Sequence, residues 1–278
     1  MKTGQNNLNK RISHFIKNFH PTTSKNNPNE LISFMDLTSL TGSETADEIT
    51  LLCHKAAGEK ETTKKCAAIC IYSKWIEMAS NIRNIIHQSK EELKAVEPTF
   101  SMATVSLGFP EGRESTDLKK GHIREALHMG ANEIDMVINH DLFLEGDTQN
   151  TQKDIQLLKE VTPLLKVIIE TGRLKTPELI YSASMVSMKS GADFIKSSTG
   201  KNYPGVNKES LCAMLFAIAD YYEQTGKKVG IKASGGIRSI TDAYDYLNLT
   251  TQILGKEYKD PKLFRIGASS LWDKCVQS

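Results

Sequence analysis

The chain has 278 residues, of which 39% are hydrophobic and 24% are charged, and its formal net charge is +2. This length fits one large α/β barrel or two ordinary domains, with a core large enough to fold without disulfides or structural metals. A net charge this small argues against the excess of basic residues that is typical of proteins that bind nucleic acid or an acidic membrane surface. Small-molecule chemistry is the better expectation.

Cysteine use and the start of the chain predict a cytoplasmic protein. The five cysteines are odd in number, and Cys66 and Cys70 have neither a second cysteine pair nor histidine partners for a zinc site. We therefore expect reduced thiols. Residues 1–29 lack an apolar stretch of signal-peptide length, and no run approaches the ~20 apolar residues of a membrane span. The basic residues of this segment leave an organellar presequence open as the alternative, but its repeated asparagines favour a polar arm or short helix.

Eight β-rich segments alternate with helix-like segments along the rest of the chain. The predicted strands are 31–37, 67–72, 101–107, 133–139, 164–171, 193–198, 228–233 and 263–267. The predicted helices are 44–55, 75–88, 117–129, 152–161, 177–189, 208–225 and 240–254. Ser115 is a candidate N-cap, and Thr176-Pro177 begins a helix that Ser190-Gly191 ends.

Alternating strands and helices predict a parallel sheet. Eight such units of roughly 30 residues, in a domain near ~250 residues, are typical of a closed (β/α)8 TIM barrel. The alternative is an open doubly wound sheet, which would have a Gly-x-Gly-x-x-Gly turn after its first strand. Residues 35–40 (MDLTSL) contain no such turn. We therefore predict one α/β barrel over 30–278, with residues 1–29 appended.

Ionisable residues inside these strands require an explanation, because the interior of such a barrel is packed with side chains. They are Asp36, Asp135, Lys166, Glu170, Lys196 and Lys232. Strand alternation gives Lys196 and Lys232 the same orientation on consecutive strands. Adjacent strands lie ~4.8 Å apart, so two inward-pointing ammonium groups would approach within several ångströms.

Two neighbouring ammonium groups indicate a nucleophilic amine. At an effective dielectric constant near ~20, like charges ~4 Å apart repel by about 4 kcal/mol, which lowers the pKa of one of the two lysines by about three units. The neutral amine attacks carbonyls, and the resulting imine is an electron sink for carbon–carbon bond cleavage. Asp135 is the candidate acid/base. The alternatives are a structural lysine at position 196 and a salt-bridge role for Asp135.

Three segments after the last strands have the composition of a phosphate site. They are Thr199-Gly200-Lys201, Ser234-Gly235-Gly236 and Gly267-Ala268-Ser269-Ser270. Backbone N–H groups and hydroxyls at strand ends suit a phosphate, and phosphate sites recur at this part of the barrel. We interpret Lys201 as a charge partner of substrate or phosphate rather than as a second nucleophile.

Four further residues are predicted either to support the site or to have no role in it. Asp36 either orients Lys232 or closes the first strand, and the two are equally favoured. Lys166 and Glu170 are predicted to form an interior ion pair that supports the site. Cys70 is predicted to be a buried, inert thiol, the alternative being a pocket thiol that aldehydes modify.

These residues together resemble the deoxyribose-phosphate aldolase family, the class I aldolases on a (β/α)8 barrel. The matching phrases are MDLT (35–38), AAICIY (67–72), GFPEG (108–112), EIDMVIN (133–139), LKVIIETG (165–172), DFIKSSTGK (193–201), GIKASGGIR (230–238) and FRIGASSL (264–271). The resemblance implies reversible cleavage of 2-deoxy-D-ribose 5-phosphate into D-glyceraldehyde 3-phosphate and acetaldehyde, without metal or cofactor. It implies that Lys196 forms the imine, that Lys232 is the cation that tunes it, and that Asp135 relays protons.

The resemblance also implies phosphate contacts and a set of partners. The implied phosphate contacts are Gly200, Lys201, Gly235, Gly236, Gly267, Ser269 and Ser270. The expected partner is a small sugar phosphate, with neither nucleic acid nor membrane, and homodimers are common in the family. Two alternatives stay open: another lysine-dependent aldolase or transferase acting on a phosphorylated keto sugar, and a catalytically silent barrel that binds sugar phosphates.

Overall fold

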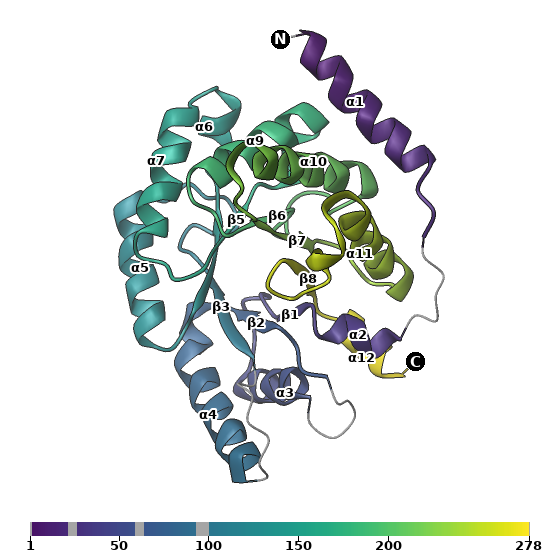
Figure 1. The fold of residues 1–278 in the computed structure, drawn as a ribbon. Helices are drawn as coiled ribbons and strands as arrows, with labels where there is room; N and C mark the ends of the chain where they lie inside the picture. Colours follow the sequence, from purple (N-terminus) through teal and green to yellow (C-terminus); the bar gives the residue numbers. More distant parts are fainter. Residues whose placement is uncertain (1, 22–26, 59–63, 93–99, 278) are drawn as a thin grey trace.

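Eight parallel strands form a closed barrel in chain order, with β8 hydrogen-bonded to β1 (Figure 1). The computed structural model describes residues 2–21, 27–58, 64–92 and 100–277. The strands are β1 (Met35–Thr38), β2 (Ala68–Ile71), β3 (Ser101–Val105), β4 (Glu133–Val137), β5 (Leu165–Ile168), β6 (Phe194–Lys196), β7 (Gly230–Ser234) and β8 (Phe264–Ala268). The predicted (β/α)8 barrel is confirmed.

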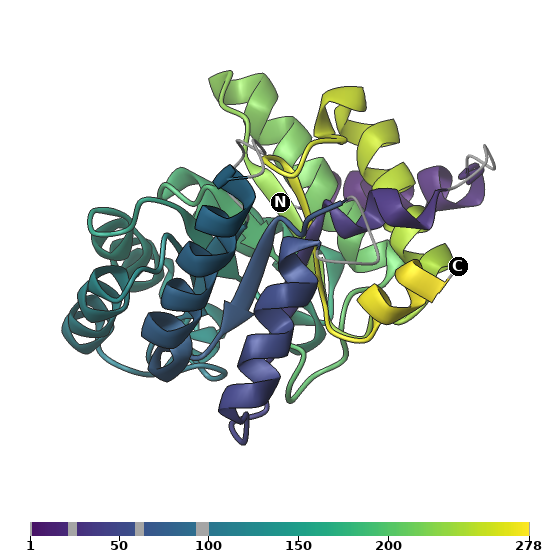
Figure 2. The same cartoon turned by 90° about the horizontal axis from the view of Figure 1, so that it is seen from below.

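Helices surround the barrel, and α3 and α4 lie side by side along one flank (Figure 2). The helices of the barrel are α2 (Pro28–Ile32), α3 (Ala46–Ala57), α4 (Ile76–Glu92), α5 (Thr116–His128), α6 (His140–Leu144), α7 (Thr148–Lys159), α8 (Thr171–Leu174), α9 (Pro177–Lys189), α10 (Lys208–Thr225), α11 (Ile240–Leu254) and α12 (Leu271–Gln277), with short 3-10 turns at η1 (Ser73–Trp75) and η2 (Lys256–Tyr258). The predicted caps are confirmed, since the hydroxyls of Ser115 and Thr176 accept from backbone N–H groups of α5 and α9.

Several predicted boundaries are wrong, and each error has a local cause. Leu31 and Ile32, predicted as the start of the first strand, instead end α2, because Asn27 caps that helix and Pro28 occupies its first turn. The fifth strand, predicted to run to residue 171, ends at Ile168, and Thr171 begins α8. Asn139, predicted as strand, instead caps α6 by accepting from the backbone N–H of Leu142.

The barrel separates two apolar cores. The larger core packs the outer faces of the strands against the helices, and the smaller one lies inside the barrel and includes Ala68, Cys70, Ala103 and Val105 from β2 and β3. The rest of the described interior is largely charged, with buried ionisable side chains on β1, β4, β5, β6, β7 and β8. A barrel interior with one apolar wall and one ionic wall suits a site for polar chemistry.

The N-terminal segment forms a helix that packs on the barrel. Helix α1 (Lys2–Lys17) lies against α9 and α10 (Figure 1), where Ile12 is buried and Phe15 meets Phe216 edge-on with ring centroids 6.0 Å apart. Arg11 Nη1 lies 2.9 Å from Asp220 Oδ2 of α10. A helix in this segment matches one of the two expected forms, while the division into a 1–29 arm and a 30–278 domain stays a prediction.

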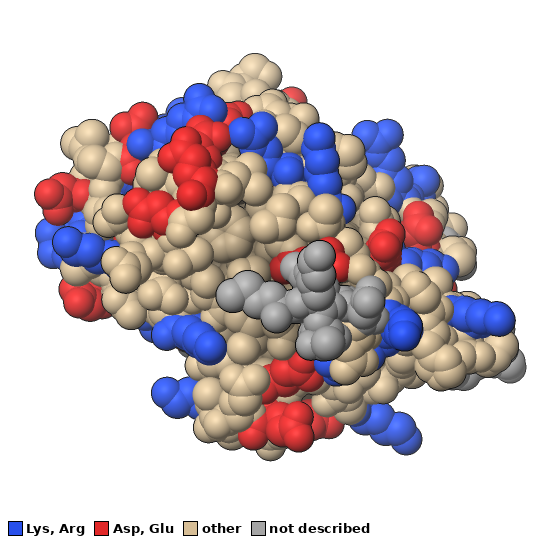
Figure 3. Space-filling model, turned by 90° about the horizontal axis from the view of Figure 1, so that it is seen from above, with Lys and Arg blue, Asp and Glu red and all other residues tan. Residues whose placement is uncertain are grey.

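The surface carries both signs of charge. Acidic and basic side chains are interspersed on the face seen from above (Figure 3), as expected for a net charge of +2. Within the described ranges, no helix is both long and apolar enough to cross a membrane. All five cysteines are buried free thiols.

Candidate active site

Lys196 and Lys232 are direct neighbours in the barrel. They are register partners on β6 and β7, and both side chains are buried. Each ammonium nitrogen lies 2.8 Å from the same oxygen, Oδ2 of Asp135 on β4. The two nitrogens are therefore no more than about 6 Å apart, as strand alternation predicts. A carboxylate shared between them partly offsets their mutual repulsion.

These three residues belong to a larger interior ion network. Its members are Asp36, Glu133, Asp135, Lys166, Lys196, Lys232 and Arg265. Lys166 Nζ lies 2.9 Å from Asp135 Oδ1 and 2.5 Å from Glu133 Oε2. Arg265 binds Asp36 and Glu133 from β8 at 2.6 and 3.0 Å. Asp36 Oδ2 lies 2.5 Å from Lys232 Nζ, which favours the orienting role among the two interpretations of Asp36.

The network fixes the charge state of most of its members. Burial alone would lower the pKa of Lys232, but the carboxylates of Asp135 and Asp36 outweigh burial and raise it above the ordinary lysine value. Burial alone would raise the pKa of Asp135, but Lys166, Lys196 and Lys232 hold it well below the ordinary aspartate value. These shifts favour the cationic form of Lys232 and the carboxylate form of Asp135.

Charge balance distinguishes Lys196 from the other cations. The network contains four cationic side chains and three carboxylates. Lys196 contacts one carboxylate, whereas Lys232 contacts two. Lys196 therefore has the fewest carboxylate contacts among the four cations of the network.

The predicted Lys166–Glu170 ion pair is wrong. Lys166 pairs with the carboxylates of β1 and β4, while Glu170 Oε2 accepts from the backbone N–H of Thr199 at 3.0 Å and from its hydroxyl at 2.5 Å. Glu170 precedes α8 with a left-handed φ of 53°, a strained conformation for a residue other than glycine. The strained backbone turns the Glu170 side chain toward the loop after β6. Glu170 thus supports the site by holding Thr199.

All of the predicted phosphate residues line one pocket at the carboxyl ends of the strands. The pocket has a volume of about 310 Å³, and its lining includes Lys196 together with Thr199, Gly200, Lys201, Gly235, Gly236, Gly267, Ser269 and Ser270. Gly235 has a φ of 91°, and an added Cβ would lie 2.6 Å from Gly205 Cα. The Gly-Gly segment is therefore both a tight turn and a pocket wall. Lys201 reaches across the pocket and donates to the carbonyl of Leu40.

Cys70 is buried beside the reacting groups. Its Sγ lies 3.8 Å from Asp135 Oδ2, and it does not line the 310 Å³ pocket. Burial, reinforced by the charge of Asp135, raises the pKa of its thiol. The geometry favours the prediction of an inert thiol over that of a pocket thiol.

Sequence reasoning missed Arg265, which pairs with Asp36, Glu133, which pairs with Lys166, and Arg238, which lines the pocket. Glu133 and Arg265 are charged residues within predicted strands, as Asp36 and Lys166 are, so the same signal applied to them. No group of three or more histidine, cysteine or acidic side chains arranged to hold a metal occurs in the described part of the chain.

The ion network predicts a loss of stability in acid. The pKa values of Asp36, Glu133 and Asp135 are lowered by their cationic partners despite burial, so their contribution is complete above the unfolded-state values near ~4 and is lost as the pH falls below them. We expect the free energy of unfolding, measured with urea between pH 3 and 7, to fall steeply below about pH 4. The variant Asp36→Asn should flatten this dependence, and Asp117→Asn, at an exposed position, should not. If the free energy of unfolding depends on pH equally in both variants, the buried ion network is not the cause of the loss of stability in acid.

Comparison with known proteins agrees with this geometry. Residues 30–273 match the model of the DeoC/LacD family aldolases. The chain is 37% identical over 253 residues to the deoxyribose-phosphate aldolase of Homo sapiens, a match that covers 86% of this chain and 76% of the human one. It is 35% identical over 255 residues to the Mus musculus enzyme, with the same coverage. Among solved structures, the tetrameric deoxyribose phosphate aldolase of Aeropyrum pernix superposes with a TM-score of 0.69 at 22% identity, over 90% of this chain and 91% of that one.

The closed parallel barrel, the polar pocket at the carboxyl ends of its strands and these matches together identify an enzyme of the aldolase class. The family match covers most of the chain. The chain belongs to the DeoC/LacD aldolase family.

Proposed function

We propose that the chain reversibly cleaves 2-deoxy-D-ribose 5-phosphate into D-glyceraldehyde 3-phosphate and acetaldehyde through an imine on Lys196. The Homo sapiens and Mus musculus relatives, at 37% and 35% identity, are deoxyribose-phosphate aldolases, which supports this substrate. The observation that carries the proposal is the position of Lys196. Its amine contacts Asp135 and neighbours Lys232, and its side chain lines the pocket of glycines and hydroxyls.

The proposed reaction begins with attack of the neutral Lys196 amine on the aldehyde carbon of the open-chain sugar, followed by loss of water. The protonated imine then accepts the electrons of the bond between the second and third carbons as that bond breaks, and the hydroxyl of the third carbon loses its proton. D-glyceraldehyde 3-phosphate leaves, the enamine takes up a proton at its terminal carbon, and water releases acetaldehyde and the free amine. Asp135, within hydrogen-bond distance of Lys196, is suited to pass these protons.

Lys232 contributes charge rather than a covalent bond in this proposal. It remains protonated between Asp36 and Asp135, so its positive charge favours the neutral form of the neighbouring amine. Thr199, held by Glu170, is one of the pocket hydroxyls that face the sugar phosphate.

A direct assay tests the reaction. Purified protein is incubated with 2-deoxy-D-ribose 5-phosphate, and acetaldehyde and D-glyceraldehyde 3-phosphate are measured by coupled reduction with their own dehydrogenases. Equal amounts of both products support the proposal. A folded protein that releases neither product but binds the sugar phosphate would instead be a silent barrel.

The phosphate assignment predicts a substrate-dependent effect of Lys201. We expect Lys201→Met to raise the KM for 2-deoxy-D-ribose 5-phosphate by roughly tenfold or more, because a cation next to the phosphate is lost. Cleavage of unphosphorylated 2-deoxy-D-ribose, measured in the same preparation, is the control, and its rate should change far less. Equal loss with both substrates would show that Lys201 acts through the loop contact with Leu40 instead.

Assembly and location are separate proposals. The Aeropyrum pernix relative has a tetrameric structure. For this chain we propose a homodimer in the cytoplasm, which sedimentation and cell fractionation would test.

A further inference from the structure

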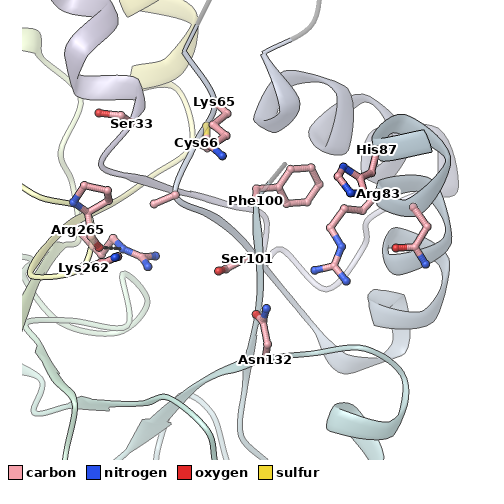
Figure 4. Close-up of a pocket in the computed structure, with 13 residues that line it drawn as sticks. Ser33, Lys65, Cys66, Arg83, His87, Phe100, Ser101, Asn132, Lys262 and Arg265 are labelled. Atoms are coloured by element: carbon pink, nitrogen blue, oxygen red, sulfur yellow. Dashed lines mark hydrogen bonds between the residues drawn. The ribbon is translucent and has the colours of Figure 1, made fainter. Parts of the chain in front are cut away.

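A second cavity, of about 570 Å³, lies at the other end of the barrel (Figure 4). Its lining includes Ser33, Ala67, Ser101, Asn132 and Lys262, which stand at or just before the first residues of β1, β2, β3, β4 and β8. Because the strands are parallel, these positions mark the amino-terminal mouth of the barrel, whereas the pocket around Lys196 lies at the carboxyl ends. The mouth cavity is therefore separate from the proposed catalytic pocket.

The charged side chains that line this cavity, among the residues that the structure describes, are all basic. Lys262 and Arg265 lie on one side and Arg83 and His87 on the opposite side (Figure 4), and Lys65 also contributes. No carboxylate lines the cavity within the described part of the chain. Basic side chains that face one another across a cavity repel, and an anion between them converts that repulsion into attraction.

Arg83 gives independent support for an anion. Its side chain on α4 is half-buried, and it makes no hydrogen bond or ion pair with any residue that the structure describes. Burial lowers the pKa of Arg83, as expected for a buried cation whose charge no carboxylate stabilises. Guanidinium groups are normally buried with a partner, and their planar donors match a phosphate group in two-point contacts.

Arg265 supplies a rigid wall on the opposite side. It is 6% exposed, and its guanidinium is oriented by Asp36 and Glu133 within the barrel and by the carbonyl of Pro261. A cation held in this way loses little conformational entropy when it binds a ligand. Lys262, which is exposed, can adapt to the ligand from the same side.

We propose that the mouth cavity binds a small metabolite that carries at least two phosphate groups. Two groups are indicated because the basic side chains lie on opposite sides of the cavity, and because its volume exceeds that of the pocket for a single sugar phosphate. The site does not depend on the proposed reaction, since none of the residues proposed for catalysis lines it.

The test uses pyrophosphate as the probe and the full chain, with titration calorimetry at constant ionic strength. We expect wild-type protein to bind pyrophosphate more tightly than inorganic phosphate. Arg83→Leu and Lys262→Ala should each weaken this binding on the order of tenfold. Lys227→Ala removes an exposed cation that does not line the cavity and should leave binding unchanged. All three variants should retain wild-type aldolase activity without pyrophosphate.

A second measurement separates the two ends of the barrel. Pyrophosphate binding that persists in Lys201→Met and weakens in Lys262→Ala belongs to the mouth cavity. The proposal is overturned if pyrophosphate binding is lost in Lys201→Met but equals that of wild type in both Arg83→Leu and Lys262→Ala. It is also overturned if the wild-type protein does not bind pyrophosphate. If Arg83→Leu does not fold, the binding affinity of Lys262→Ala for pyrophosphate decides the test. The Lys262 side chain is exposed, so its removal should leave the protein folded.

Discussion

Replacement of Lys196 by methionine is expected to reduce aldolase turnover by about 10⁴-fold or more, because loss of a covalent nucleophile removes the whole imine pathway. Methionine fills the space of the lysine stem but offers no amine. In wild-type protein, borohydride reduction in the presence of acetaldehyde should trap the imine as a stable adduct. Peptide mass spectrometry should find the adduct mass on Lys196 and should not find it in Lys196→Met.

The matched control for this experiment is Lys189→Met, which removes an exposed lysine of α9. It should retain wild-type turnover and the Lys196 adduct. An adduct on Lys232 or Lys201 in wild-type protein would keep the aldolase chemistry and overturn the assignment of the nucleophile. Absence of any adduct in active protein would exclude an imine mechanism.

Replacement of Lys232 by methionine should impair both catalysis and folding. Without this cation, Asp36 and Asp135 lose a shared partner, and breaking a buried ion pair on one side costs about 3–5 kcal/mol of folding free energy. Loss of the adjacent positive charge also makes the protonated form of Lys196 easier to retain. We expect turnover at pH 7 to fall by roughly 10²-fold or more and to recover partly as the pH rises.

Lys119→Met separates the electrostatic effect from simple destabilisation. Lys119 is another fully buried lysine, but its ammonium lies in the helix layer, 2.8 Å from Asp154 and 3.0 Å from the carbonyl of Gly112. We expect Lys119→Met to lower the urea midpoint by a similar amount while the pH dependence of turnover stays as in wild type. If both variants show the same pH profile, Lys232 does not tune the nucleophile.

The sequence by itself determined the architecture and the central pair of the site. The strand and helix alternation specified the barrel, because each β-rich run was short, apolar and separated from the next by one helix. The orientation of Lys196 and Lys232 followed from the two-residue period of consecutive strands, a local property that needs no tertiary information. That the residues proposed to bind phosphate line one pocket also followed from the sequence, because strand ends in a parallel barrel share one face.

Only the tertiary structure decided which charges meet across the barrel. Lys166 and Glu170 lie four residues apart in one segment, but they do not pair. The left-handed backbone at Glu170 directs its side chain to Thr199. The ammonium group of Lys166 binds the carboxylates of Asp135 and Glu133. The contact between Arg265 and Glu133 joins β8 to β4, strands that do not pair in the sheet. Such contacts depend on the closure of the barrel, which brings side chains of distant strands into one desolvated interior. In that interior, every buried charge requires an opposite charge, and the spacing of residues along the chain does not specify which one.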